Sequence, residues 1–486
     1  MILFESTWRV VRVVEGARLE SVYTGPRIEG SNPSLSAIKV SYRILLSKIL
    51  FFVYEEFFMK KIIKSGIILV LYCFMCMQIN IVTAQSISNE ISNEKFKYLA
   101  AWTSLAVYND KISVLARDVL EENGWQINVQ NEKIVNSDVK YLLANKHFDN
   151  NNVLFLSISG TSSWEDVKTD LSVEAVNFGG KNIDEFITTM KNEQLLKDNP
   201  LVHKGFLKYV QDGFFTPNTN NEILGIKIKE HLKNNPQDKI YITGHSLGGA
   251  VAELLTARLL DMGVNKDQIV TITFGAPAVG NKAFVEQYEP KMNLTRITMK
   301  GDVVKNLAQI ANERFVQFKN NEEWSITQND NDKFAHNMLL YFDRAMRNYY
   351  DIYGNELKNQ MQNKTQCEYY VVAPKYNFPK EIQSEINYIN LALTDKMLKK
   401  KQVCFMEDSL NVDAFSRAKA LGAKYVIFYE YSADKLKDTT SNKRYYINAA
   451  KYVYDINGNL IQGESINTDT NQMTILQAVL YANSQL

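Results

Sequence analysis

Short apolar runs alternate with longer stretches of helical periodicity along the middle of the chain. Four runs have the length and the β-branched and aromatic content of buried strands, and they occupy residues 153–159, 239–243, 269–274 and 294–300. After the second run, GAVAELLTARLLDMG is apolar at helical spacing. Such alternation predicts an α/β fold, a mostly parallel sheet covered by helices. Residues 93–110 predict an amphipathic helix that precedes the first of these strands.

The pattern changes after residue 354. Residues 355–366 are polar with few large apolar side chains, and we expect a linker there between a domain of residues 85–354 and a second domain of residues 367–486. In the second domain, a helix that stops at Gly422 is followed by a strand, a hairpin around Asn457-Gly458 and a closing helix, which predicts a small α+β domain. LGAKYVIFYEY and the strand pair after it resemble αβ domains of periplasmic proteins of the Tol and curli-secretion types. No catalytic constellation stands out there, so we expect a binding or packing role.

Residues 59–84 have the pattern of a secretory signal peptide. A basic start is followed by an apolar core over 67–77 and by the small-residue site Val-Thr-Ala. The core is shorter than the ~20 residues that span a bilayer, so we expect cleavage, no lasting membrane span and a secreted or periplasmic, cell-envelope location; the alternative is a membrane anchor. Because a signal peptide should begin a chain, we expect translation to start at Met59 and residues 1–58 to be a misassigned upstream segment. The alternative is a cytosolic tail before an anchor.

Composition narrows the function further. The 486 residues are 45% hydrophobic and 22% charged, with a net charge of +1, which is ordinary for a soluble protein and does not favour a nucleic-acid partner. No glycine-rich phosphate-binding motif follows a strand, and no metal site or cofactor is expected. Two of the four cysteines lie in the signal segment. Cys367 and Cys404 are the only ones left in the exported part, and we expect them to pair.

The sequence Gly244-His245-Ser246-Leu247-Gly248 lies between a predicted strand and a predicted helix. This context is the one a nucleophile elbow requires. The turn is so sharp that side chains at positions 244 and 248 would collide, hence the two glycines. The turn would present the Ser246 hydroxyl above the sheet and aim the Leu247 N–H at a developing oxyanion. The sequence therefore predicts a catalytic serine rather than an ordinary strand-to-helix turn.

A catalytic serine needs a base and an orienting carboxylate, which follow it along the chain in α/β-hydrolases. Of five histidines, only His336 lies downstream of the elbow, so chain order selects it. Asp302, in a Gly-Asp turn after the fourth strand, is the best carboxylate candidate. Five other downstream acids stay open on order alone, namely Glu313, Glu322, Glu323, Asp330 and Asp332.

Six blocks in order resemble the class 3 lipases, the fungal triacylglycerol lipase type. The blocks are VLFLSISGTSSWEDVKTDL, VHKGF, ITGHSLGGAVAELL, TFGAPAVGNKAF, RITMKGDVV and HNMLLYF. The resemblance covers roughly residues 90–350 and implies the α/β-hydrolase fold, with Ser246, Asp302 and His336 as the triad. It also implies that Thr161 and the Leu247 N–H form the oxyanion hole. Departures at Ser159, Pro277-Ala278 and Lys305-Asn306 leave this chemistry intact and bear on the substrate pocket and lid.

The resemblance implies an exported lipase or esterase that cleaves lipid esters, with residues 162–178 as a lid that opens at a lipid–water interface. A plain surface helix is the alternative for this segment. The alternative for the whole chain is an inactive hydrolase scaffold that serves a surface or periplasmic binding function through its C-terminal domain.

Overall fold

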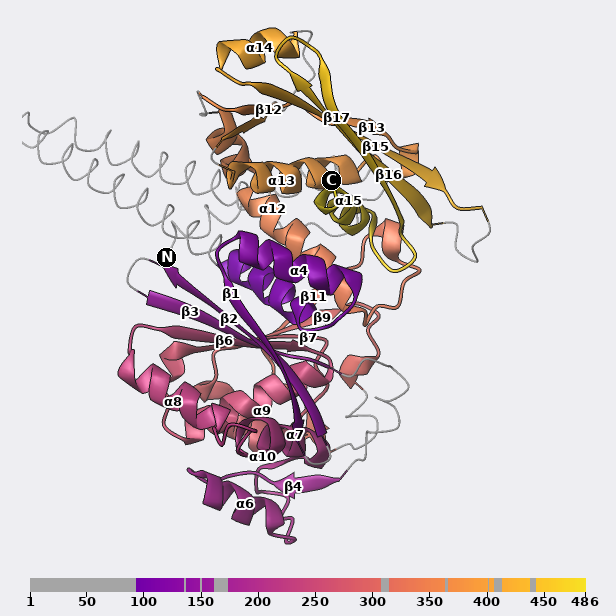
Figure 1. Ribbon diagram of the computed structural model, residues 1–486. Coiled ribbons are helices and arrows are strands. Elements are labelled where there is room, and N and C mark those ends of the chain that lie inside the picture. The colour runs from indigo at the N-terminus through magenta and orange to yellow at the C-terminus, as the bar shows by residue number, and fades with distance from the viewer. Residues whose placement is uncertain are drawn as a thin grey trace, which may run out of the picture. The chain divides into compact units, whose positions relative to one another are not determined.

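The structure is a computed structural model. It describes residues 93–134, 137–148, 151–160, 174–306, 314–362, 366–400, 402–405, 413–437 and 443–486. The expected upstream segment, the expected signal peptide, Thr161 and residues 162–173 of the candidate lid lie outside the described residues. Residues Ile87–Leu486 form one compact unit, shown in Figure 1.

A seven-stranded sheet in the order β1-β2-β3-β6-β7-β9-β11 forms the centre of the first part of this unit. Its strands are β1 (Gln126–Ile134), β2 (Ser137–Phe148), β3 (Asn151–Ile158), β6 (Lys239–His245), β7 (Ile269–Phe274), β9 (Leu294–Met299) and β11 (Asn321–Trp324). The strands from β3 to β11 are parallel, and β1 and β2 add an antiparallel arm at one edge. The four predicted strands and the mostly parallel sheet are therefore confirmed.

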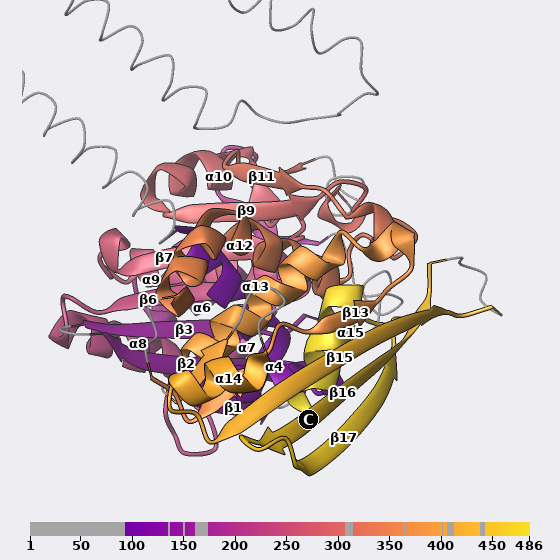
Figure 2. The ribbon, with the colours of Figure 1, turned by 90° about the horizontal axis from the view of Figure 1, so that it is seen from above.

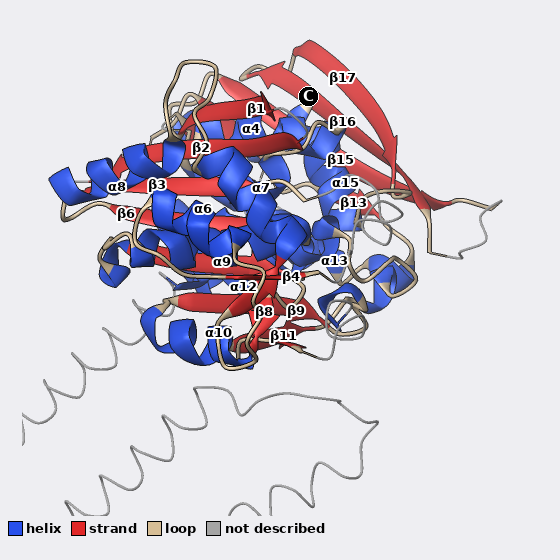
Figure 3. Ribbon diagram, turned by 90° about the horizontal axis from the view of Figure 1, so that it is seen from below, coloured by secondary structure: helices blue, strands red, loops and turns tan. Residues whose placement is uncertain are grey.

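Helices cover both faces of this sheet (Figures 1 and 3). They are the helix of residues 93–106, α4 (Lys111–Glu122), α7 (Lys204–Phe214), α8 (Leu224–Asn234), α9 (Leu247–Asp261) and α12 (Met338–Gln362). Two more helices, α6 (Ile183–Lys191) and α10 (Lys282–Tyr288), pack on the short strands of residues 175–177, 201–203, 280–281 and 315–316. Alternate strand residues point to opposite faces. Thus Phe155 and Tyr241 pack with the first helix, α4 and α12, whereas Leu156 and Ile242 pack with α7, α8 and α9.

The first part also contains a small second sheet in the order β10-β8-β5-β4. Its strands are β4 (Ala175–Asn177), β5 (Leu201–His203), β8 (Gly280–Asn281) and β10 (Phe315–Val316). Residues 175–178 were expected to lie in a lid or surface helix, but they form β4 and the buried Phe178. The reason is that β4 pairs with β5 and that Phe178 packs on the Arg258 guanidinium at 3.9 Å, which fixes this end of the segment.

The C-terminal part is built on a six-stranded sheet in the order β14-β12-β15-β16-β17, with β13 paired to β15 (Figure 2). Its elements are β12 (Tyr369–Val371), β13 (Lys375–Asn377), α13 (Glu385–Leu398), β14 (Val403–Phe405), α14 (Ala414–Ala420), β15 (Tyr425–Lys435), β16 (Tyr445–Asp455), β17 (Leu460–Asp469) and α15 (Ile475–Ser484). Short 3₁₀ helices in the described chain are η1 (Lys266–Gln268), η2 (Glu289–Lys291), η3 (Val304–Asn306), η4 (Gln328–Asp330) and η5 (Lys380–Ile382). The hairpin between β16 and β17 and the stop of α14 at Gly422, which has φ 74°, are both confirmed.

Residues 355–362, the first part of the expected linker, continue α12 as helix. Their two large apolar side chains, Leu357 and Met361, are buried, which explains why this polar stretch stays helical. Nearer the N-terminus of α12, Arg347 binds Asp343 (Nε–Oδ2 2.6 Å) and Glu385 of α13 (Nη2–Oε2 2.5 Å). α12 therefore packs against both the first part and the C-terminal part.

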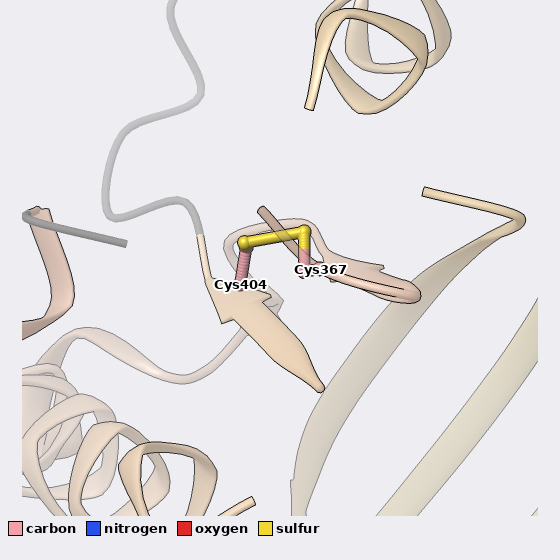
Figure 4. Close-up of a disulfide and its surroundings, with 2 residues drawn as sticks. All are labelled: Cys367 and Cys404. Atoms are coloured by element: carbon pink, nitrogen blue, oxygen red, sulfur yellow. A yellow bond between two sulfur atoms is a disulfide. The ribbon is translucent and has the colours of Figure 1, made fainter. Parts of the chain in front are cut away.

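Cys367 and Cys404 form a disulfide (Figure 4), which confirms the predicted pair. Their Cα atoms are 5.6 Å apart, and the closed loop spans a sequence separation of 37. Cys404 lies in β14, opposite Tyr370 of β12.

We expect the double variant Cys367→Ala, Cys404→Ala to lose about 3 to 4 kcal/mol in free energy of unfolding. The reason is that the unfolded chain without the disulfide has a higher conformational entropy. Urea denaturation of the variant and of the oxidised parent measures the difference. Finding two free thiols in the denatured, natively exported protein would contradict the pairing.

Candidate active site

Ser246 occupies the tight turn between β6 and α9. Its φ of 58° lies in the left-handed region, which a non-glycine residue rarely adopts. Its N–H donates to the carbonyl oxygen of Phe274 (2.9 Å), and its own carbonyl accepts the N–H of Gly249 (3.0 Å) at the start of α9. These bonds and the burial of Ser246 hold the strained turn in place.

The two elbow glycines are required by close backbone contacts. A Cβ on Gly244 would lie 2.4 Å from the carbonyl carbon of Gly248. A Cβ on Gly248 would lie 2.1 Å from the carbonyl oxygen of Ile158 in β3. Side chains at positions 244 and 248 would therefore collide with neighbouring backbone.

His336, two residues before α12, pairs with Asp302, which follows β9. His336 Nδ1 lies 2.8 Å from Asp302 Oδ2, and both side chains are buried. Burial alone would raise the pKa of Asp302, but hydrogen bonds from His336, Tyr341 and the Val304 N–H outweigh it and hold that pKa below 3.8. Asp302 is therefore ionised at neutral pH and can accept the imidazole N–H.

His245 and Gly275 connect this pair to the elbow. His245 Nε2 lies 2.6 Å from the carbonyl oxygen of His336, with ring centroids 4.4 Å apart. Burial, followed by repulsion from His336, lowers the pKa of His245 to about 3, so His245 is neutral. A Cβ on Gly275, at the end of β7, would lie 2.8 Å from Asp302 Oδ2 and 3.0 Å from His336 Nδ1. The elbow, His336 and Asp302 thus meet at the carboxyl ends of β6, β7 and β9.

The other acids that chain order left open are engaged elsewhere. Their partners are Lys97 for Glu322 (2.6 Å), Lys305 for Glu323 (2.6 Å), Thr327 for Asp330 (2.9 Å) and Arg444 for Asp332 (3.2 Å). Glu313 lies outside the described residues. Among the described candidates, Asp302 is the acid that binds His336.

Of the two predicted oxyanion donors, Leu247 is described and Thr161 is not. Leu247 is the first residue of α9, and the first N–H groups of a helix have no acceptor within it. Gly160, the residue before Thr161, donates its N–H to the hydroxyl of Tyr108 (2.9 Å), and a Cβ on it would lie 3.4 Å from Ser246 Cβ. Gly160 therefore lies beside the elbow.

Sequence analysis missed the role of Tyr341. Its hydroxyl donates to Asp302 Oδ2 (2.6 Å) and accepts the N–H of Met299 (2.9 Å), so it ties the carboxylate to the end of β9. Tyr341 comes five residues after His336, inside the block HNMLLYF. The sequence pattern that could have indicated this role is the position of Tyr341 near the start of the helix that follows His336.

The described residues contain no group of three or more His, Cys, Asp or Glu side chains arranged to hold a metal ion. Over the same ranges, no helix is both long and apolar enough to cross a bilayer.

Comparison with known proteins finds a family match over the part of the chain that contains Ser246 and Asp302. Residues 155–312 match the family model described as Lipase (class 3). Similar curated proteins include Lipase ZK262.3 of Caenorhabditis elegans (43% identity over 70 residues, 14% of this chain and 20% of that protein) and Phospholipase A1-II 1 of Oryza sativa subsp. indica (31% over 118 residues, 22% and 30%). The lipase of Rhizomucor miehei is 31% identical over 131 residues, 26% of this chain and 33% of that protein.

The chain spans about a fifth to a third of the length of these curated relatives. Among solved structures, the triacylglyceride lipase of Rhizomucor miehei is 22% identical with a TM-score of 0.37, over 50% of this chain and 82% of that one. The matched segment includes Ser246 and Asp302, and His336 lies beyond its end. Residues 155–312 thus match the class 3 lipase family, to which the sequence blocks within this segment pointed.

Proposed function

We propose that this protein is a serine hydrolase that cleaves carboxylic esters of lipids through an acyl-enzyme. The observation that carries the proposal is the buried His336–Asp302 pair beside a serine held at positive φ on a strand-to-helix turn. The class 3 lipase segment supports the same chemistry. We propose residues 85–354 as the hydrolase domain and residues 367–486 as an appended α+β domain.

In this mechanism, Ser246 Oγ attacks the ester carbonyl carbon while His336 Nε2 takes the hydroxyl proton. Asp302 accepts a hydrogen bond from His336 Nδ1 and stabilises the imidazolium cation that forms. The N–H of Leu247, with Thr161, would hold the oxyanion of the tetrahedral intermediate. His336 then gives the proton to the leaving alcohol, the acyl-enzyme forms, and a water molecule activated by His336 releases the carboxylic acid and frees Ser246.

Labelling with a fluorophosphonate, which reacts preferentially with an activated serine, tests the proposal directly. We expect Ser246 to carry the label, identified by mass spectrometry of the digested protein. A panel of esters graded by chain length, assayed below and above the solubility limit, then defines the substrate. A jump in rate above that limit would support action at a lipid–water interface.

Tyr341→Phe should lower kcat about tenfold and leave KM unchanged, because it removes one hydrogen bond that positions Asp302 and touches no substrate. The matched control is Tyr288→Phe, which removes another buried tyrosine–aspartate bond, to Asp261 Oδ2 (2.7 Å), outside the site. Equal losses of kcat in the two variants would show that Tyr341 is only structural.

We propose that the protein is exported with cleavage after Ala84. The disulfide supports an oxidising compartment. N-terminal sequencing of the exported product should begin at or near Gln85. A product that still carried residues before Met59 would contradict both the cleavage and the start site.

A further inference from the structure

The segment that carries His336 has little regular structure of its own. It comprises residues 325–337, between β11 and α12, and we call it the base loop. After η4, its backbone makes two turn bonds, from the Lys333 N–H to the Asp330 carbonyl (3.0 Å) and from the Asn337 N–H to the Phe334 carbonyl (2.8 Å). A segment held by so few internal bonds takes its position from the groups around it.

The C-terminal part binds the chain on both sides of His336. Before it, Lys333 Nζ donates to the carbonyl oxygen of Thr470 (2.8 Å). After it, the carbonyl oxygen of Leu339 accepts a hydrogen bond from Gln477 Nε2 (2.6 Å). The side chain of Lys333 is 7% exposed, and Thr470 and Gln477 are buried. Both bonds are therefore shielded from water, which could otherwise replace a lost partner.

Thr470 and Gln477 are themselves fixed by the fold of the C-terminal part. Gln477 belongs to the capping box of α15, in which its Oε1 accepts the N–H of Thr474 (3.0 Å) and its N–H donates to Thr474 Oγ1 (3.3 Å). The cap fixes the amide with its NH₂ group on Leu339. Thr470 donates its N–H to the carbonyl oxygen of Tyr445 in β16 (3.0 Å), and its Oγ1 accepts the N–H of Tyr445 (2.9 Å). The C-terminal part thus presents two preformed contacts to the chain around His336.

Two further contacts join the start of the base loop to the C-terminal part. Asn329 Nδ2 donates to Glu385 Oε1 of α13 (2.8 Å), and Arg444 Nη1 lies 3.2 Å from Asp332 Oδ2. The side chains of Arg444 and Asp332 are 16% and 25% exposed, and an ion pair that water reaches contributes little. Loss of the Asp332 charge should therefore matter less than loss of a buried bond next to His336.

We propose that Lys333 and Gln477 are positioning residues for His336, and that the C-terminal part is thereby a required component of the hydrolase site. The proposal rests on the proposed function, in which His336 is the base. The two buried bonds hold the backbone before and after His336, so that the imidazole stays on Asp302. Loss of either bond should lower kcat and leave KM unchanged, because neither residue is placed against the substrate. Bonds that only attached the two parts to each other would change stability and leave kcat unchanged.

Steady-state kinetics on a soluble ester, below the unfolding transition of each variant, tests this role. Gln477→Met removes the amide at similar side-chain volume and should lower kcat about tenfold. The matched control is Asp413→Ala, which removes the N-cap of α14 in the same part (Asp413 Oδ1 to the Phe415 N–H, 3.1 Å) and should cost stability but keep kcat. Lys333→Met should also lower kcat about tenfold, and Lys333→Arg, which keeps the charge and the donors, should restore it to within about twofold of the parent. Parental kcat in both Gln477→Met and Lys333→Met would overturn the proposal.

Proton NMR of the imidazole separates this proposal from the proposed function, because it needs no substrate. The proton between His336 Nδ1 and Asp302 Oδ2 should give a downfield resonance that His336→Ala lacks. We expect exchange with water to broaden this resonance in Gln477→Met and in Lys333→Met, and to leave it sharp in Asp413→Ala.

The two measurements together assign each failure. If the parent neither hydrolyses esters nor reacts with a fluorophosphonate, but its resonance depends on Gln477 and Lys333, the proposed function fails and the positioning role stands. If the parent is active and neither kcat nor the resonance responds to these residues, the positioning role alone fails. A parent without the resonance would contradict the hydrogen bond between His336 and Asp302 on which both proposals depend.

Discussion

Ser246→Ala should lower the rate of ester hydrolysis about 10⁴- to 10⁶-fold while the protein remains folded. Ser246 is the nucleophile in the proposed mechanism, and the alanine side chain cannot form the acyl-enzyme. Alanine has no larger side chain than serine, so the turn between β6 and α9 should keep its geometry. Initial rates on a soluble ester, together with a thermal unfolding curve for each protein, measure both quantities.

The matched control is Ser104→Ala. Ser104 is a buried serine whose hydroxyl lies 3.0 Å from that of Thr243, in the strand that leads to the elbow. We expect its activity to stay within a few fold of the parent. If Ser246→Ala kept more than a few per cent of the activity, another nucleophile would have to be sought.

His336→Ala should lower the rate of ester hydrolysis nearly as much as Ser246→Ala does. Asp302→Ala should lower kcat about 10⁴-fold. In the proposed mechanism, His336 accepts and returns the proton in both half-reactions, and Asp302 selects the tautomer that leaves Nε2 able to accept. The loss in Asp302→Ala should appear in kcat, because the carboxylate stabilises a charge that develops in the transition state. Steady-state kinetics on the same soluble ester measures the split between kcat and KM.

Charge-removing substitutions of the other downstream acids are the controls for Asp302. Glu322→Gln, Asp330→Asn and Asp332→Asn remove carboxylates whose partners lie elsewhere, and we expect each to keep most of the activity. If Asp302→Ala were mild and one of these variants inactive, the carboxylate would be reassigned and the roles of Ser246 and His336 would stand.

The strands and the elbow could be predicted because their signals are local. A buried parallel strand is a short apolar run, and a sharp turn needs glycine at fixed positions around Ser246. His336 followed from chain order, since no other histidine lies downstream. These inferences required no knowledge of which distant residues meet.

What the sequence could not provide was the partner of each polar group. Asp302 was one of six acids on chain order. Its turn after the fourth strand and the family resemblance favoured it, and the fold brings its carboxylate to His336. Tyr341 looked like one more aromatic residue on an amphipathic helix, because nothing in a linear pattern shows that its hydroxyl meets an aspartate across the turn after β9.

The continuity of α12 has a consequence for how the protein unfolds. Tyr341, near its start, supports Asp302, and Arg347, farther along, forms buried ion pairs with Asp343 and with Glu385 of the C-terminal part. Thr474, at the start of α15, adds a hydrogen bond to Asp343 (2.7 Å). Loss of the C-terminal part would remove Glu385 and Thr474 and leave Arg347 and Asp343 without these partners. Breaking a buried ion pair in this way carries a high free-energy cost. The two parts should therefore melt in one cooperative transition, and a chain cut after residue 354 should lose the order of its catalytic end together with its thermal stability.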